Sequence, residues 1–236
     1  IGLSIAKLLL KNGYIVYGLD RNENFGDFET LKCDITNLDR VRECFDYING
    51  KEGHIDVLVN NAGMGISGAV EYIDDEKTKK LFDVNMFAVL NLSKMIIPYF
   101  KQNGGGKIVN TSSLAGVIPL PFQTAYSMSK SAVNSLTMCL SMEVAPLNIK
   151  VCAVMPGDTA TGFTKAREKQ NKSDEYGDRI NRSVSKMEKD ETHGMSPDRV
   201  AKVVLKQIKR KNPTSKTLLM LHLKKIVQIH QRLKMI

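Results

Sequence analysis

The chain has 236 residues, of which 42% are hydrophobic and 25% charged, and its formal net charge is +9. This composition is typical of a globular protein, and we expect neither a signal peptide nor a membrane span, since no basic start with a cleavage site and no apolar run near the necessary ~20 residues occurs. The positive charge lies at one end: eleven Lys and Arg and no acidic residue follow position 198, which leaves 23 basic against 25 acidic residues before it. We therefore expect no nucleic-acid partner.

Helical and strand-like patterns alternate along the chain. Four apolar runs with little alternation, at residues 14–19, 55–59, 107–109 and 149–154, are typical of parallel strands covered by helices on both faces. The other expected strands are 31–36 and 216–221, and the expected helices are 4–13, 38–50, 74–102, 124–145 and 196–211. This order predicts an α/β fold with a doubly wound, Rossmann-like parallel sheet in a three-layer α/β/α arrangement.

One domain is expected over residues 1–236. Residues 158–195 interrupt the alternation with a polar segment beyond a strand end, where open α/β sheets place substrate loops. Residues 196–236 supply a helix, a short strand and a basic tail. The four cysteines, which show no paired spacing, are interpreted as buried thiols of a reducing cytoplasm, with no disulfide and no metal site: Cys33, Cys44, Cys139 and Cys152.

A tyrosine followed four residues later by a lysine occurs twice. Tyr47 and Lys51 are separated by Asn49-Gly50, which we expect to break the helix, so no fixed face presents both groups. Tyr126 and Lys130 lie one turn apart in an unbroken helical pattern, and we expect them on one face.

Two further polar residues accompany Tyr126. Ser113 comes just after the strand at 106–113, at the sheet edge where α/β proteins place reacting groups. Asn85 sits in the middle of a predicted helix, a position that its propensity disfavours. No G-x-S-x-G elbow is present and no histidine is placed to serve Ser113, which argues against a serine hydrolase.

Five motifs together resemble the short-chain dehydrogenase/reductase family over essentially the whole chain. They are "NNAG" at 60–63, the mid-helix Asn85, "NTSSLAG" with Ser113, "YSMSK" at 126–130, and "PGDTAT" at 156–161. The resemblance implies an NAD(P)-dependent enzyme that interconverts a secondary alcohol and a carbonyl. Tyr126 is then the acid and base, assisted by the Lys130 ammonium, which favours the phenolate. Lys130 is also expected to bind the nicotinamide ribose, Ser113 to orient the substrate oxygen, and Asn85 to hold a water.

The resemblance also assigns a cofactor site. Gly2 matches the end of the family's glycine-rich turn, so we expect the first strand and the earlier glycines to be missing from the chain. Asp20, 18 residues later, is placed for the adenosine ribose and favours NAD(H), whereas Arg21 makes NADP(H) the alternative. The remaining contacts implied are Asp34 and Ile35 at the adenine, Asn61, Ala62 and Gly63 below the adenosine, and Pro156, Gly157, Thr159 and Thr161 at the nicotinamide.

The substrate class is less constrained by the sequence. The C-terminal pattern resembles the branch of the family that acts on retinoids, hydroxysteroids and related lipophilic alcohols. The two long helices at 74–102 and 124–145 resemble those through which family members form homodimers or homotetramers. The basic tail could touch an anionic membrane surface weakly, or pack against protein with its lysines solvated. The alternative function is a non-catalytic dinucleotide-binding protein of the same fold.

Overall fold

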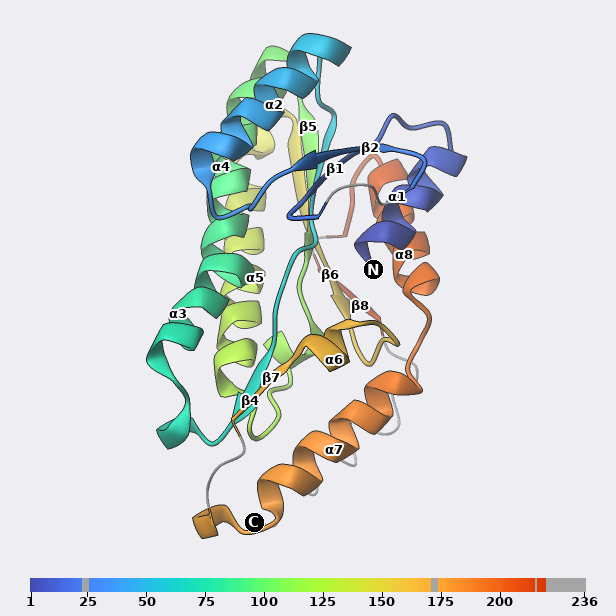
Figure 1. Ribbon diagram of the computed structural model, residues 1–236. Coiled ribbons are helices and arrows are strands. Elements are labelled where there is room, and N and C mark those ends of the chain that lie inside the picture. The colour runs from blue at the N-terminus through green and yellow to red at the C-terminus, as the bar shows by residue number, and fades with distance from the viewer. Residues whose placement is uncertain (23–25, 171–173, 215, 220–236) are drawn as a thin grey trace.

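The computed structural model describes residues 1–22, 26–170, 174–214 and 216–219 (Figure 1). The helices are α1 (Gly2–Lys11), α2 (Leu38–Glu52), α3 (Asp75–Phe82), α4 (Ala88–Gln102), α5 (Thr124–Glu143), α6 (Phe163–Ala166), α7 (Arg179–Thr192) and α8 (Pro197–Lys209). The strands are β1 (Tyr17–Asp20), β2 (Glu29–Lys32), β3 (Val57–Asn60), β4 (Ile66–Gly68), β5 (Gly106–Thr111), β6 (Ile149–Pro156), β7 (Glu168–Gln170) and β8 (Lys216–Leu219).

All strand pairs in the described residues are parallel. The largest sheet has the order β3-β5-β6-β8, with Asn60 opposite Asn110 and Thr111 opposite Val154. Separate two-stranded pairs join β1 to β2 and β4 to β7. The predicted doubly wound parallel architecture is therefore confirmed, although the hydrogen-bonded ladder is divided.

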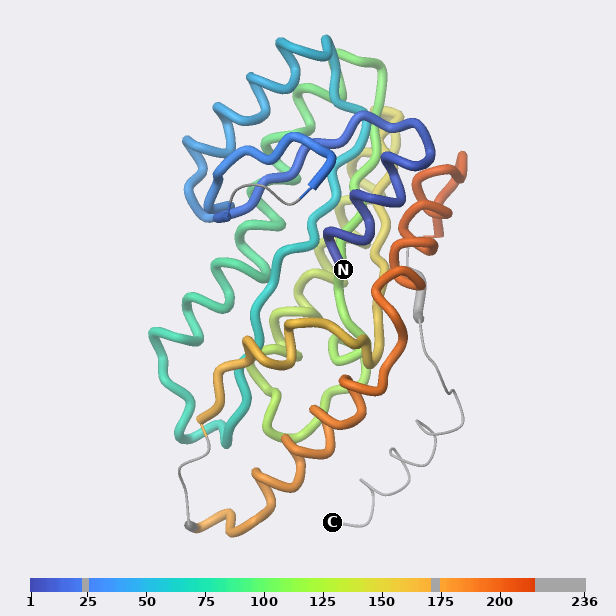
Figure 2. Tube along the Cα trace, turned by 45° about the vertical axis from the view of Figure 1, so that its right-hand side comes forward, coloured from blue at the N-terminus to red at the C-terminus, as the bar shows by residue number. Residues whose placement is uncertain are grey.

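Helices cover both faces of the central sheet, which gives the three expected layers (Figures 1 and 2). On one face, α2, α4 and α5 pack on the sheet through a core that contains Phe45, Ile96, Phe100 and Ile108. On the other face, α1 and α8 pack side by side, and their core includes Ile5, Leu9, Val154, Val200 and Val204. Burial of these apolar side chains is the main force that fixes the helices on the sheet.

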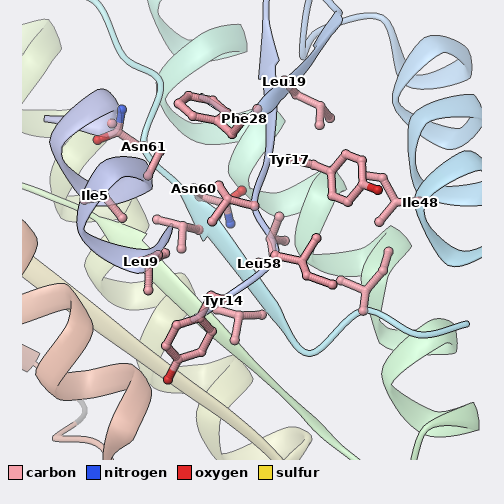
Figure 3. Close-up of a pocket in the computed structure, with 18 of the residues that line it drawn as sticks. Ile5, Leu9, Tyr14, Tyr17, Leu19, Phe28, Ile48, Leu58, Asn60 and Asn61 are labelled. Carbon is pink, nitrogen blue, oxygen red and sulfur yellow. The ribbon is translucent and has the colours of Figure 1, made fainter. Parts of the chain in front are cut away.

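A cavity of about 710 Å³ lies between β1 and β3 (Figure 3). It is lined by side chains of α1, β1 and β3, among them Leu9, Tyr17, Leu19 and Leu58. The facing edges of β1 and β3 are joined by no ladder in the described residues. This is the arrangement expected of a doubly wound sheet without one of its central strands.

The long predicted helix at 74–102 contains a wide turn that the sequence pattern did not indicate. Its α-helical parts, α3 and α4, are joined without a break by a π-helical turn at Asp83–Phe87. By length and composition the 28 residues Asp75–Gln102 could cross a membrane, but core helices pass the same test. Here Leu92, Ile96 and Phe100 are buried against the sheet.

Two expectations about other segments are wrong. The helix α2 continues through Asn49-Gly50, so Tyr47 and Lys51 do share a face, with Lys51 Nζ 3.4 Å from the Tyr47 hydroxyl. Both groups bind the carboxylate of Glu29 at the molecular surface, where a solvated network is their evident role. Cys139 is exposed because it lies on the outer side of α5, whereas the other three cysteines are buried, and all four are free thiols.

The predicted substrate loop contains regular structure. Residues 158–195 contain α6, β7 and the 14-residue helix α7. The helix α7 buries only Ile180, Val184 and Met187, at helical spacing on one side, and this sparse apolar stripe explains why the segment reads as polar loop. The division of residues 1–236 into one domain with this insertion stays a prediction. Residues 220–236 of the basic tail lie outside the described residues.

Two glycines provide a test of the packing. A Cβ at Gly106 would lie 2.3 Å from Cγ of Phe100, whose ring is fully buried and cannot move away, whereas a Cβ at the exposed Gly50 of α2 would meet nothing within 4 Å. We expect Gly106→Ala to lower the free energy of unfolding by ~1–3 kcal/mol through overpacking. Gly50→Ala should raise it by roughly 0.5–1 kcal/mol through helix propensity. Urea unfolding measures both, and equal effects of the two changes would contradict this packing.

Candidate active site

The predicted catalytic and nicotinamide-side residues gather at one edge of the central sheet. The strands β3, β5 and β6 are parallel, so their carboxyl ends, at Asn60, Thr111 and Pro156, share this edge. The motifs that carried the sequence prediction follow these strands directly. Open α/β sheets bind ligands at this edge.

Tyr126 lies half-buried in the first turns of α5, with Ser113 close enough to lower the pKa of its phenol. Ser113 caps the short 3-10 turn Leu114–Gly116, where its Oγ accepts from the backbone N–H of Ala115 at 3.2 Å. This turn packs tightly on α5, since a Cβ at Gly116 would lie 2.7 Å from the backbone carbon of Lys130. The close approach brings Ser113 to Tyr126.

Burial raises the pKa of Tyr126, the Ser113 hydrogen bond lowers it, and the nearby Glu191 raises it while Arg167 lowers it. The net direction is upward, which opposes the expectation that Lys130 depresses this pKa. The physical reason is that desolvation of the phenolate outweighs the favourable contacts. A phenol with a raised pKa is held in the protonated form, ready to donate.

Lys130 is buried at the same edge. Its ammonium donates to the carbonyl of Thr111 at 3.0 Å, and Nζ lies 5.9 Å from the centroid of the Tyr126 ring. Burial lowers the pKa of Lys130 to about 8. The predicted pair therefore does share one face of α5, with the ammonium behind the phenol.

Asn85 occupies the π-helical turn between α3 and α4 and is fully buried. Its Oδ1 accepts from the backbone N–H of Met64 at 2.8 Å, and its Nδ2 donates to the Met64 carbonyl at 2.9 Å and to Ser129 Oγ at 3.1 Å. The side chain therefore joins the segment after β3 to α5. The widened turn is what allows a polar side chain at this position, because π-turns commonly mark functional sites in helices.

A chain of buried side-chain hydrogen bonds joins the strands next to the site to α5. Asn60 Nδ2 donates to Asn110 Oδ1 at 2.9 Å, and Asn110 Nδ2 donates to Thr137 Oγ1 at 2.9 Å. The chain crosses from β3 through β5 to α5. Since buried polar groups need partners, it fixes how α5 is rotated against the sheet.

Several predicted cofactor residues are brought together at this edge. A Cβ at Gly2 would lie 2.7 Å from Nδ2 of Asn61, and one at Gly63 would lie 3.3 Å from Oδ1 of Asn85 and 3.5 Å from Nζ of Lys130. Ala62 and Gly63 are exposed, so their backbone can be approached from outside. The open backbone, the glycine at the start of α1 and the adjacent ammonium fit a nicotinamide dinucleotide.

The predicted adenosine-side residues lie on the β1–β2 pair. Asp20 ends β1 and is exposed, and its Oδ1 accepts from the N–H of Asn22 at 2.9 Å. Asp34 follows β2, where hydrogen bonds from Thr36 lower its pKa and the charge of Arg21 adds to this. Ile35 packs against the core. The backbone N–H of Cys33 donates to the Asp20 carbonyl, so the two carboxylates stand at the same end of this pair.

The predicted nicotinamide-side residues follow β6. Pro156 ends that strand, and Thr159 Oγ1 donates to the carbonyl of Gly157 at 2.9 Å. Thr159 pairs with Met195, which closes the base of the substrate loop. Thr161 Oγ1 accepts from the N–H of Phe163 at 3.2 Å.

Sequence reasoning missed several neighbours of Tyr126. Ser129 is a partner of Asn85 and donates to the Tyr126 carbonyl, and its place inside the YSMSK motif was the available signal. Phe163 lies against the Tyr126 ring, 5.6 Å between centroids, and no pattern indicated it because it comes from the irregular loop. The Thr111 carbonyl that binds Lys130 is backbone and carries no sequence signal.

The burial of Lys130 gives a test by pH. Because the folded state releases this proton near pH 8 and the unfolded chain near 10.5, the unfolded chain binds more protons between these values. The free energy of unfolding then rises with pH across this window, by at most about 3 kcal/mol. Lys130→Met lacks this contribution, so wild-type stability minus variant stability should increase from about pH 7 to about pH 10. Urea unfolding at several pH values checks this; parallel curves for the two proteins would contradict it.

Comparison with known proteins agrees with this geometry. The family model of the short chain dehydrogenases matches residues 1–172. The 3-ketodihydrosphingosine reductase of Bacteroides thetaiotaomicron is 41% identical over 221 residues, 92% of this chain and 82% of that protein. A short-chain dehydrogenase from Streptomyces avermitilis has a TM-score of 0.86 at 24% identity, covering 99% of this chain and 88% of that one. A 3-ketoacyl-(acyl-carrier-protein) reductase from Brucella melitensis, solved with NADH, has a TM-score of 0.76 at 25% identity, over 92% and 89%. The chain belongs to the short-chain dehydrogenase family and is an NAD(P)-dependent oxidoreductase.

Proposed function

We propose that this enzyme interconverts a secondary alcohol and a carbonyl by hydride transfer, with Tyr126 as the proton donor and acceptor. The observation that carries the proposal is that Ser113 lies close enough to Tyr126 to lower the pKa of its phenol, with the Lys130 ammonium 5.9 Å from the centroid of the phenol ring. The nicotinamide cofactor supplies or accepts the hydride when it is bound. The protein's own residues handle the proton and the substrate oxygen.

In reduction, the carbonyl oxygen gains negative charge and has to be protonated. Tyr126 donates this proton, and Ser113 donates a hydrogen bond to the same oxygen. In oxidation the reverse step needs a phenolate, which the Lys130 ammonium stabilises.

Lys130 and Asn85 complete the proposed proton path. The Thr111 carbonyl holds the Lys130 ammonium beside Gly63. In this position Lys130 is proposed to bind the cofactor ribose. Asn85 also lies next to Gly63. The proposed role of Asn85 is to hold a water that connects Lys130 with solvent. The carboxamide is fixed for this by the Met64 backbone and Ser129.

The proposed substrate is a lipophilic ketone. The relative from Bacteroides is named for the reduction of 3-ketodihydrosphingosine, and this compound is the first to test. Retinoid and hydroxysteroid carbonyls are the next compounds to test, because the C-terminal sequence pattern resembles that of family members that act on such compounds. A dinucleotide-binding protein without catalysis is the alternative, which binding without turnover would support.

The proposed assembly is a cytoplasmic homodimer or homotetramer. The long helices α4 and α5 carry apolar side chains on their outer sides, with Leu90, Met138 and Met142 exposed by 39%, 43% and 68%. A second copy of the chain could cover this surface, and sedimentation velocity distinguishes the two states.

The role of Tyr126 can be tested by removing one oxygen. Tyr126→Phe is expected to lower kcat by about 10²–10⁴-fold, because the proton donor is lost, with an unchanged dissociation constant for NADH. The control is Tyr99→Phe, which removes a hydroxyl that binds Asp46 at 2.6 Å on the far part of α4. Wild-type turnover in the Tyr126 variant, measured with 3-ketodihydrosphingosine, would show that the proposed mechanism is wrong.

The cofactor preference depends on Asp20. A carboxylate there repels the 2′-phosphate of NADPH, so the wild type should bind NADH more tightly. Asp20→Asn is expected to tighten NADPH binding by roughly fivefold, equivalent to ~1 kcal/mol, with a smaller change for NADH. Fluorescence titration with both cofactors measures this, with Asp46→Asn as the control. If the wild type binds NADPH more tightly than NADH, Arg21 and not Asp20 determines the cofactor preference.

A further inference from the structure

The ring of Phe163 is held between Tyr126 and Arg167. The centroids of the Tyr126 and Phe163 rings are 5.6 Å apart at an angle of 52°, and the guanidinium carbon of Arg167 lies 5.6 Å from the Phe163 centroid. Another part of the ring meets Gly65, where a Cβ would lie 2.9 Å from Phe163 Cζ. Phe163 is nevertheless only half-buried, so part of it remains exposed beside the tyrosine.

Arg167 is fixed by a buried ion pair across the substrate loop. Its Nη2 binds Oε1 of Glu191, and the two side chains are 2% and 15% exposed. Glu191 Oε2 also accepts from Thr164 Oγ1 at 2.7 Å. The pair therefore joins the segment that begins with Phe163 to the end of α7. The base of the same loop is closed by backbone hydrogen bonds of Met195 with Asp158 and Ala160.

The second nitrogen of the guanidinium, Nη1, is buried and has no hydrogen-bond partner. An unpaired buried donor on a charged group destabilises the folded state, and a well-packed apolar pair would often be at least as stable. Stability therefore does not explain why a guanidinium stands here. Its place over the Phe163 ring, with the guanidinium carbon 5.6 Å from the centroid, does, because the planar cation of Arg suits an aromatic ring better than the ammonium of Lys.

We propose that Phe163 determines specificity for ketones with an extended apolar substituent, and that Arg167 and Glu191 are positioning residues that hold its ring against Tyr126. The inference rests on the proposed function of Tyr126. With the substrate oxygen at Tyr126 and Ser113, an apolar substituent on the carbonyl carbon lies against the exposed part of the Phe163 ring. Glu191 and Arg167 both act on the pKa of Tyr126, after burial and the Ser113 hydrogen bond, which agrees with their closeness to the reacting atoms.

The test compares methyl hexyl ketone with methyl ethyl ketone, using the full chain and NADH. The two substrates present the same reacting group and differ only in apolar length. The wild type should have the higher kcat/KM for the longer ketone. In Phe163→Ala, kcat/KM for methyl hexyl ketone should fall by about tenfold, mainly through a higher KM. Loss of the contact with an aromatic ring lowers affinity by about this factor. The value for methyl ethyl ketone should fall less than this, and the dissociation constant of NADH should not change.

The positioning roles are tested by a double-mutant cycle. Arg167→Met and Glu191→Gln should each reduce the preference for the longer ketone, and Phe163→Ala combined with Arg167→Met should be no worse than Phe163→Ala alone. Arg167→Lys, which keeps a cation for Glu191 and so preserves the fold, should also lose the preference. The matched control is Lys169→Met, since Lys169 and Glu188 form a partly exposed ion pair, at 2.7 Å, between the same two segments. It should leave both ketones unaffected.

The outcomes separate this inference from the proposed function. Equal decreases of kcat/KM for both ketones in Phe163→Ala would overturn the specificity role. If the decrease in the double variant were the product of the two single decreases, the positioning roles would be overturned. A wild-type preference in Arg167→Lys would overturn the stacking role of the guanidinium. A wild type that binds NADH but reduces neither these ketones nor 3-ketodihydrosphingosine would overturn the proposed function itself.

Discussion

The parallel pairing of β3, β5 and β6 is the constraint on which the site depends. The register places Asn60 opposite Asn110, so that their side chains stand on one face of the sheet and continue to Thr137 on α5. Lys130 lies two turns before Thr137, on the same side of the helix. The hydrogen bonds of this buried chain fix the rotation of α5, and the same rotation directs the ammonium of Lys130 toward the edge where the strands end. The packing of the sheet and the direction of the catalytic groups are consequences of the same register.

Lys130, for which a catalytic role is proposed, illustrates how function and stability can oppose each other. Its ammonium donates to the Thr111 carbonyl and is buried, and this desolvation lowers its pKa to about 8. In the folded state a buried cation of this kind is destabilising near neutral pH. The same desolvation strengthens its electrostatic effect on any charge that develops at Tyr126. The large cores on both faces of the sheet offset the loss.

The sequence predicted the layered fold and the motifs at the sheet edge because both depend on local patterns. Apolar runs identify parallel strands, and motifs such as YSMSK keep their spacing in the chain. It failed where a weak local signal competed with tertiary packing. Gly50 was expected to end α2, but the helix is held by the burial of Cys44, Phe45 and Ile48 and ends only at Gly53. The helix α7 was missed because three apolar side chains suffice for its packing.

Side-chain contacts across long loops were beyond the reach of the sequence. Arg167 and Glu191 are 24 residues apart in a segment whose apolar periodicity is weak, and the folding of that segment brings them together. The raised pKa of Tyr126 was missed for a related reason. The spacing of Tyr126 and Lys130 shows that the ammonium is near, but the degree of burial that outweighs it depends on the whole surrounding structure.

The two halves of the site are supported in different ways. Ser113 follows β5, Tyr126 and Lys130 lie on α5, and Asn85 lies in the π-helical turn before α4. Buried hydrogen bonds tie α5 to the central sheet, and Asn85 is bonded in turn to α5 through Ser129. Asp20 and Asp34 lie on the β1–β2 pair, which shares no ladder with that sheet in the described residues and faces it across the cavity. The halves are linked by α1, which packs on α8 and whose Gly2 lies against Asn61, and by the core against which Leu19 and Leu31 pack. In the proposed mechanism, the sheet therefore fixes the geometry of proton transfer, whereas affinity for the adenosine half of the cofactor depends on how firmly the β1–β2 pair is held beside β3.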